Sequence, residues 1–421
     1  MSHSCALRAP AGSFFISVPP SSCYVGQIAA HIHPYPQIPS SLVRCARGGW
    51  QVLREPRRGG RGMRFELPEE LEMLRSVVSD FAQSELASGA IERDANERFD
   101  RAVFDQMAEL GLTGIPVPET YGGAGASWLA YVVVLEEIAK VCASSASVLA
   151  AHTAGAGWPL YRYGSEAVRE GLLVPLASGA KLAGTCVTKR KAAALLGTHP
   201  FVLNAGAADG CLFVTEERGN DGELKPTVEW IPSEPAAAMS TSLTSKLGLR
   251  SFPTGRLTLS PRTSDLHKYI IVQGRRVSEV ARDVGTMLAL SAAAQSVGIA
   301  QGALEAAASY AKERKQFGTP IGRQQGILFK LSDMSIATEA SRLLVRQAAW
   351  QLDEHINTAA KASTQVQLAR AYAARSATMV AREAVQIHGG YGYIEEYQVE
   401  RMLRDAMMLE TEVSIGALSQ R

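Results

Sequence analysis

Three glycines within four residues, at positions 389, 390 and 392, interrupt a long helical pattern near the C-terminus. Glycine is unfavourable inside a helix because it loses more backbone freedom on folding than any other residue. We therefore expect one helix to end at Gly389 and Gly390, and a second helix to begin near Glu395 or Glu396. Such a bare turn lets a bulky anion approach main-chain N–H groups, although many glycine turns are only helix C-caps.

The residues around this turn form an ordered pattern. Gln386 precedes the glycines, an aromatic residue follows at Tyr393, and Glu396, Arg401 and Asp405 continue the series. This pattern resembles the C-terminal signature of the acyl-CoA dehydrogenases, the flavoenzymes that desaturate acyl-CoA thioesters. The resemblance extends over nearly all of residues 63–421.

Composition excludes several classes of function. The chain has 421 residues, enough for two or three domains with a large core, and its formal net charge is only +2. A nearly balanced charge gives no reason to expect nucleic-acid or membrane-surface binding, and no uninterrupted apolar run predicts a membrane span. The six cysteines show no CxxC or metal-ligand spacing, so we expect free thiols and no metal site.

Residues 1–62 differ from the rest of the chain, with seven arginines, no lysine and a single acid, Glu55. An Arg-rich, acid-poor leader is typical of a mitochondrial transit peptide, but its prolines disfavour the amphipathic helix that such a peptide needs. The favoured alternative is translated upstream sequence, with the true start at Met63. Either way we expect disorder here. We expect a cytoplasmic protein if it is bacterial, and a mitochondrial matrix protein if the segment is a transit peptide.

Hydrophobic periodicity divides the remainder into three parts. Helical spacing of apolar residues covers 63–182, strand-like runs cover about 183–270, and helical periodicity returns over 271–421. The predicted fold class is α+β and mainly α, with an N-terminal helical bundle, a small middle β domain and a C-terminal antiparallel four-helix bundle. The resemblance implies that the middle domain is a barrel-like sheet that covers the flavin ring.

The middle domain departs from the family pattern in two places. The family follows its Cys-Val-Thr strand with an acidic, Gly-rich loop. Here a basic run follows Val187 and Thr188, and Ala193 and Ala194 replace a glycine and a serine. A family strand is also absent between residues 201 and 209. We therefore expect a shortened sheet, which leaves backbone groups unpaired unless it is rearranged or covered by a partner.

A second candidate site lies at the end of the helix that runs to Arg314. A guanidinium there is a good bidentate phosphate ligand, and Phe317 could stack on a planar ring. The plainer interpretation is a contact with the helix dipole and a core phenylalanine. The resemblance implies that Arg314 binds the pyrophosphate of FAD. The full set that it implies for FAD binding is Val187, Thr188, Arg314, Gln316, Phe317, Gln325, Gln386, Gly389 and Gly390.

The family reaction needs a carboxylate base, because the proton next to the thioester carbonyl is a weak acid. Most members place a glutamate at the position where this chain has Val413. Glu412 is adjacent, and it can serve as the base only if the turn shifts by one residue. Otherwise Glu412 is a solvated acid at a helix end. Some relatives take the base from an upstream helix, where this chain has Leu288.

The resemblance leaves two main functions open. The first is an FAD-dependent acyl-CoA dehydrogenase that desaturates an acyl-CoA substrate and passes electrons to an electron-transfer flavoprotein. The second is a catalytically defective structural subunit of a heteromeric acyl-CoA dehydrogenase, and a decayed gene product is a third interpretation. Since a neighbouring subunit holds the adenosine half of FAD in the family, we expect a homotetramer, a dimer or a heteromer with a homologous subunit.

Overall fold

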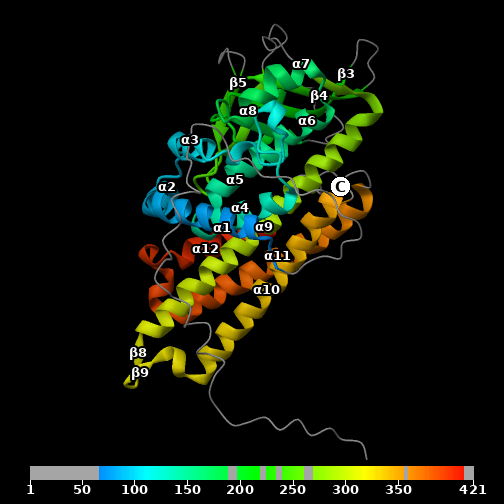
Figure 1. Ribbon diagram of the computed structural model, residues 1–421. Helices are drawn as coiled ribbons and strands as arrows, with labels where there is room; N and C mark the ends of the chain where they lie inside the picture. The colour runs from blue at the N-terminus through cyan, green and yellow to red at the C-terminus, as the bar shows by residue number, and fades with distance from the viewer. Residues whose placement is uncertain are drawn as a thin grey trace, which may run out of the picture. The chain divides into compact units, whose positions relative to one another are not determined.

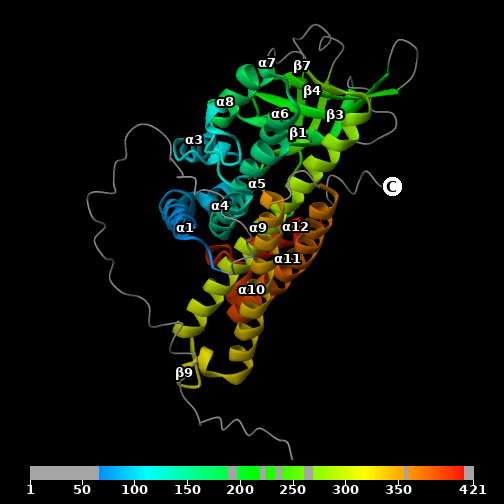
Figure 2. The same cartoon turned by 45° about the vertical axis from the view of Figure 1, so that its right-hand side comes forward.

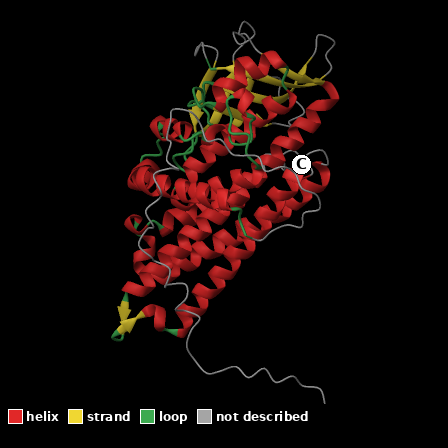
Figure 3. Cartoon of the chain, in the orientation of Figure 1, coloured by secondary structure: helices red, strands yellow, loops and turns green. Residues whose placement is uncertain are grey.

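The computed structural model describes residues 66–187, 197–218, 224–233, 239–259, 269–354 and 359–411. The expectations for residues 1–62 lie outside these ranges. Within them, helices precede and follow one large sheet, which confirms the α+β, mainly α class. Figure 3 shows the strands of this sheet gathered at one end of the helices, with a short two-stranded hairpin at the other end.

Helices dominate the part of the chain that precedes the sheet. α3 (Arg101–Glu109) begins where the Asp100 carboxylate accepts a hydrogen bond from the Ala102 amide at 3.1 Å. It ends before Gly111, whose φ of +72° is the conformation that glycine commonly adopts after a helix C-terminus. The other α-helices here are α1 (Glu69–Phe81), α2 (Ala87–Ala95), α4 (Trp128–Val141), α5 (Ala143–His152), α6 (Trp158–Tyr163), α7 (Glu166–Val168) and α8 (Val174–Ala177). The short 3-10 helices are Leu112–Gly114 and Glu119–Tyr121. The short π-helical segments are Ala82–Leu86, Thr153–Gly157 and Arg169–Leu173.

The helix α4 is buried on almost every side, as its apolar sequence predicts. Even Glu136 and Glu137 are buried, and Arg342 of α10 (Gln325–Glu354) pairs with Glu136 at 2.7 Å. The neighbouring helix α9 (Val277–Glu313) approaches α4 closely at Gly298, where an added Cβ would lie less than 3.0 Å from the Glu136 carbonyl oxygen. Small residues thus allow these two helices to pack backbone against backbone.

The middle of the chain forms a seven-stranded sheet in the order β5-β6-β2-β1-β3-β4-β7. β1 and β3 are parallel, and the other neighbouring strands are antiparallel. β1 pairs with β2 only at Thr185 and Leu203, next to the stretch where the sequence departs from the family. The described strands leave two edges, so they form an open sheet and not a closed barrel. Their bounds are β1 (Ala183–Val187), β2 (Gly197–Leu203), β3 (Gly210–Arg218), β4 (Leu224–Pro232), β5 (Met239–Leu243), β6 (Thr254–Leu259) and β7 (Tyr269–Gln273).

Four long segments of helix follow the sheet. They are α9 (Val277–Glu313), α10 (Gln325–Glu354), α11 (Ala359–His388) and α12 (Val399–Thr411), and the hairpin β8 (Lys315–Gln316) and β9 (Thr319–Pro320) separates α9 from α10. Figures 1 and 2 show α9, α10 and α11 side by side. The segment Gly274–Glu313 is long and apolar enough to cross a membrane, but 83% of its most apolar window is buried, so α9 is the central core helix.

The predicted start of the last helix is wrong by a few residues. The chain makes 3-10 turns at Gly389–Tyr393 and Glu395–Tyr397, and α12 begins only at Val399. Gln398 adopts a left-handed conformation with φ +59°, which a continuous helix cannot contain. The end of the preceding helix at His388, immediately before Gly389, is as predicted.

Candidate functional site

The three glycines of the turn have different surroundings. Gly389 has φ +61°, a conformation that other residues rarely adopt. Gly392 is buried, and an added Cβ would lie less than 3.0 Å from the Val385 carbonyl oxygen. Gly390 is exposed, and an added Cβ would meet nothing within 4 Å. The fold of this chain therefore does not explain Gly390, but close approach by a ligand would explain it.

The end of α9 lies against this turn. The exposed Arg314 follows the last residue of α9, and its guanidinium carbon lies over the ring of Tyr391 at 5.9 Å from the ring centre. The Arg314 backbone is held on both sides, because its amide donates to the Tyr310 carbonyl at 2.8 Å and its carbonyl accepts from the Ile321 amide at 2.8 Å. A fixed cation and a bare backbone thus stand together, which is the chemistry that binds a phosphate group.

A cluster of aromatic rings connects the end of α9 with the end of α11 and the turns that follow it. Tyr310 of α9 stacks on His388 of α11 with ring centres 4.3 Å apart. Tyr397 contacts both rings, and it also contacts Tyr391 at 5.3 Å. His388 Nδ1 donates to the Ala384 carbonyl at 2.8 Å, and burial lowers the pKa of this imidazole, which favours its neutral form. The Tyr391 ring under Arg314 is therefore part of a packed unit.

The hairpin after Arg314 presents an unusual aromatic residue. Gln316 pairs with Thr319 across a two-residue turn in which Phe317 has φ +53° and Gly318 has φ +80°. Two positive φ values suit a tight hairpin, but a bulky aromatic residue is rarely found there. The Phe317 side chain is 96% exposed, so the expectation of a core phenylalanine is wrong and the ring is available to a partner molecule.

The two predicted glutamines lie on the same end of the helical part. Gln325 is the first residue of α10, Gln386 lies in the last turn of α11, and both are exposed. An ion pair between Lys330 and Glu383 ties these two helix ends together. The structure therefore groups Arg314, Gln316, Phe317, Gln325, Gln386, Gly389 and Gly390 near one end of the helices.

Val187 does not join this group. It is the last residue of β1 and packs in a core with strands of the sheet. Figure 2 shows β1 and the hairpin strand β9 at opposite ends of the described chain. The predicted FAD residues thus fall into two sets that one chain keeps apart. Thr188, Ala193, Ala194, Glu412 and Val413 lie outside the described residues.

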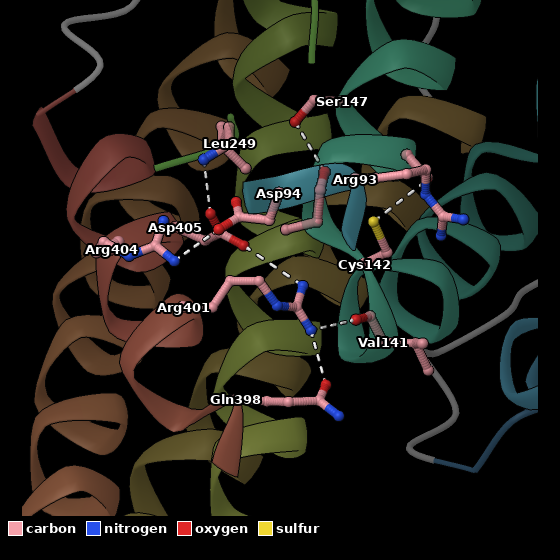
Figure 4. A network of polar contacts seen from close by, with 12 residues as sticks. Arg93, Asp94, Val141, Cys142, Ser147, Leu249, Gln398, Arg401, Arg404 and Asp405 are labelled. Carbon is pink, nitrogen blue, oxygen red and sulfur yellow. Dashed lines mark hydrogen bonds and ion pairs between the residues drawn. The ribbon is translucent and has the colours of Figure 1, made fainter. Parts of the chain in front are cut away.

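Arg401 and Asp405 of the sequence pattern have an internal role (Figure 4). Both are buried, and Arg401 donates to the Val141 carbonyl at 3.0 Å and to Gln398 at 2.9 Å. Asp405 accepts from the Leu249 amide at 2.6 Å. Burial raises the pKa of Asp405 to about 6, although the nearby Arg401 guanidinium opposes this shift. These residues fix α12 to the end of α4 and to the segment before β6.

A neighbouring ion pair that the sequence reasoning missed extends this attachment. Arg404 donates to Asp94 of α2 at 2.6 Å and to Glu400 at 2.7 Å. Gly248 allows the close approach, because an added Cβ would lie less than 3.0 Å from the Arg404 carbonyl oxygen. Nothing local in the sequence connects positions 94, 248 and 404. The first two turns of α12 are therefore anchored to α2, to the end of α4 and to the segment before β6.

A cavity of about 40 Å³ lies beside the end of α12. Its walls come from α5, α9, α11, α12 and the residues Leu203 and Phe252. Leu288, at the upstream base position of some relatives, lines this cavity, and so does Leu409 in the last turn of α12. One of the two positions from which the family draws its base therefore borders this cavity, and Leu409 lies four residues before the other, Val413, which is outside the described residues. No acidic residue is among the described residues that line it.

Comparison with known proteins identifies the family. The chain matches the model of the acyl-CoA dehydrogenase N-terminal domain over residues 68–180 and that of the C-terminal domain over residues 280–412. The chain belongs to the acyl-CoA dehydrogenase family. It is similar to a probable acyl-CoA dehydrogenase of Bacillus subtilis, with 36% identity over 83% of this chain and 95% of that protein.

Solved and characterised relatives agree with this assignment. The butyryl-CoA dehydrogenase structure from Megasphaera elsdenii has a TM-score of 0.76 and 30% identity, covering 83% of this chain and 96% of that one. A subunit of the caffeyl-CoA reductase-Etf complex of Acetobacterium woodii is 32% identical over 80% of this chain and 92% of its own length. Members of the acyl-CoA dehydrogenase family are flavoprotein oxidoreductases that act on CH–CH groups, and this chain is one of them.

Proposed function

We propose that the chain binds FAD and desaturates an acyl-CoA thioester between its α and β carbons, and that electrons pass to an electron-transfer flavoprotein. The observation that carries the proposal is the surface at Gly390, where Arg314 lies over Tyr391 beside open backbone. A diphosphate fits this surface, because a guanidinium binds phosphate oxygens and a glycine without a side chain lets such a group approach the main chain. The electron-transfer flavoprotein is supported by the Etf complex to which the Acetobacterium woodii relative belongs.

In this proposal, each FAD contacts residues from two subunits. Arg314, Gly389 and Gly390 hold the diphosphate, with Gln325 and Gln386 on the adenosine side. Gln316 and Phe317 of the same surface reach toward the flavin ring, while Val187 and Thr188 belong to the sheet side. β1 and the hairpin lie at opposite ends of the described chain (Figure 2). A single flavin that contacts residues of both regions must therefore bind between two chains. We therefore infer a dimer, a homotetramer or a heteromer with a homologous subunit.

For this desaturation, the protein must position the acyl group, hold the flavin and remove the α-proton. The bound FAD supplies the acceptor for the hydride that leaves the β-carbon. The cavity beside Leu288 and Leu409 holds the acyl chain, and its apolar walls exclude water, which makes a nearby carboxylate more basic. Glu412 is the proposed base for the α-proton, and Asp405 and Arg404 hold α12, whose last residue, Thr411, directly precedes Glu412 in the sequence.

The second candidate function is a structural subunit of a heteromeric acyl-CoA dehydrogenase. One observation favours it: Leu288 occupies the upstream base position in the cavity wall, and Val413 occupies the usual one in the sequence. Such a subunit would lend Arg314 and the glycine turn to the flavin of its partner. It would perform no proton transfer itself.

Spectroscopy of the purified full-length chain separates the two functions. Under the first, the protein carries flavin, and its visible absorption bleaches when a panel of acyl-CoA thioesters is added without oxygen. The Glu412→Gln variant loses the bleaching, and the matched Glu410→Gln variant keeps it. Under the second, the chain is colourless alone and gains flavin only with a homologous subunit. Bleaching that persists in Glu412→Gln would remove Glu412 as the base.

A further inference from the structure

The cavity beside α12 has two buried polar side chains in an otherwise mostly apolar wall. Ser147 of α5 and Gln295 of α9 face it, and only 5% and 3% of these residues are exposed. We propose that this cavity selects a short acyl chain that carries a neutral hydrogen-bonding group at its far end, with Gln295 and Ser147 as the residues that recognise it. This inference rests on the proposed dehydrogenase function.

The position of the cavity identifies it as the place for the reacting part of the acyl chain. Leu288 marks the upstream base position, and Leu409 lies three residues before Glu412. A base at the Leu288 position acts on the α-carbon, so the cavity that this position borders receives the carbons next to the thioester. Gln295 lies two helical turns beyond Leu288 on α9, so it meets atoms further along the acyl chain.

The size of the cavity limits the length of that chain. A volume of about 40 Å³ has room for about three water-sized groups. The side chains of Leu203 and Phe252 form part of the walls. A chain that extends only one or two heavy atoms past the β-carbon fits this space, and a longer chain would extend beyond it.

The polar pair keeps hydrogen-bonding capacity for a ligand. The Ser147 hydroxyl lies 2.6 Å from Gln295 Oε1 and 3.0 Å from the Ala143 carbonyl oxygen. Its single hydrogen goes to one of these acceptors, and its oxygen can accept a bond. Gln295 Nε2 donates one N–H to the Ser291 carbonyl at 3.1 Å, and an amide has a second N–H. The cavity wall therefore offers both a donor and an acceptor.

A purely apolar chain end would cover the second N–H of Gln295 without giving it a partner. A site with such a buried donor discriminates against an analogue that lacks the matching group, because the desolvated donor is left unpaired. Arg370 also borders the cavity, but it donates to the Leu409 carbonyl at 3.3 Å and supports the end of α12. We therefore assign recognition to the neutral pair, and a negatively charged chain end serves as the contrasting probe.

The role of Gln295 and Ser147 is tested by isothermal titration calorimetry, which compares the affinity of the full-length protein for two thioesters of equal size. One probe is a four-carbon acyl-CoA with a hydroxyl on its terminal carbon, and the other is the five-carbon acyl-CoA with a methyl in its place. The wild-type protein should bind the hydroxyl probe at least about fivefold more tightly. Gln295→Met and Ser147→Ala should abolish or reverse this preference. The remote control Gln347→Met on α10 should keep it.

Flavin content, read from the visible spectrum, separates failure of this inference from failure of the proposed function. If the protein carries flavin and binds the methyl probe equally well or better, the inference is overturned while the dehydrogenase assignment stands. Tighter binding of a four-carbon acyl-CoA with a terminal carboxylate would assign recognition to Arg370 and overturn the role of the neutral pair. If no thioester binds, the cavity is not an acyl site and both proposals fail. The preference of the wild-type protein alone decides the matter if the variants do not fold.

Discussion

Alanine substitution at each glycine of the 389–392 turn separates ligand binding from folding. An alanine at Gly390 meets open space, so the free energy of unfolding should change by no more than about 0.5 kcal/mol. Its methyl group would nevertheless occupy the surface that we propose for the FAD diphosphate. Losing one charge-assisted hydrogen bond to phosphate costs about 1.5–3 kcal/mol, so FAD affinity should fall by about tenfold or more.

The neighbouring glycines supply matched controls. Gly392→Ala brings a methyl group against the backbone of Val385, which cannot rotate away, and overpacking of this kind costs about 1–3 kcal/mol. Gly389→Ala places a side chain at φ +61°, which costs about 1–2 kcal/mol. Both variants should therefore lower the free energy of unfolding. Gly390→Ala should lower FAD affinity and leave stability intact.

Two measurements check the series. Urea unfolding of the flavin-free protein gives stability, and titration with FAD followed by the change in flavin fluorescence gives affinity. If Gly390→Ala binds FAD as tightly as wild type, the open backbone is not the phosphate site. If Gly392→Ala is as stable as wild type, the packing of the turn against α11 is not as described.

Three further predictions follow from the structure. Tyr391→Leu should weaken FAD binding by about two- to fivefold, because it removes the ring under Arg314, whereas Tyr391→Phe should keep the affinity of wild type. Arg404→Met leaves the buried Asp94 carboxylate without its partner, so urea unfolding should show a loss of about 3 kcal/mol, and adding Asp94→Asn should recover part of it. The buried His152 ring, whose Nδ1 accepts from the Ala183 amide at 3.0 Å, has a pKa lowered to about 4 by desolvation, so acid should destabilise the fold. The unfolded state takes up this proton first, and about 3 kcal/mol of stability should be lost as the pH falls from about 6.5 to 4.

The pH prediction needs a difference measurement, because buried acids act in the opposite direction. Desolvation raises the pKa values of Asp353 and Asp405 to about 6, so the stability that they contribute is present at low pH and lost as the pH rises through 6. His152→Gln removes only the imidazole titration. The free energy of unfolding of this variant should fall less steeply between pH 6.5 and 5 than that of wild type. Parallel pH profiles would contradict the role of His152.

The sequence alone determined the features that depend on local chemistry. Periodicity placed the helices, and Gly389 marked the end of one of them because glycine adopts a positive φ without strain. The ordered residues around the turn were enough to indicate the family. Local rules failed at Gln398, whose left-handed conformation delays α12 by several residues, because nothing in its side chain predicts that geometry.

Only the tertiary structure decided what individual residues do. The sequence shows three equivalent glycines, but contacts with Val385 and open space beyond Gly390 distinguish their roles. Arg401 and Asp405 look like site residues in the pattern, yet they are buried and hold α12 to distant segments. The cavity likewise joins Ser147, Gln295 and Leu409 from three helices. Such contacts depend on segments far apart in the chain, and local propensity carries no information about which of them meet.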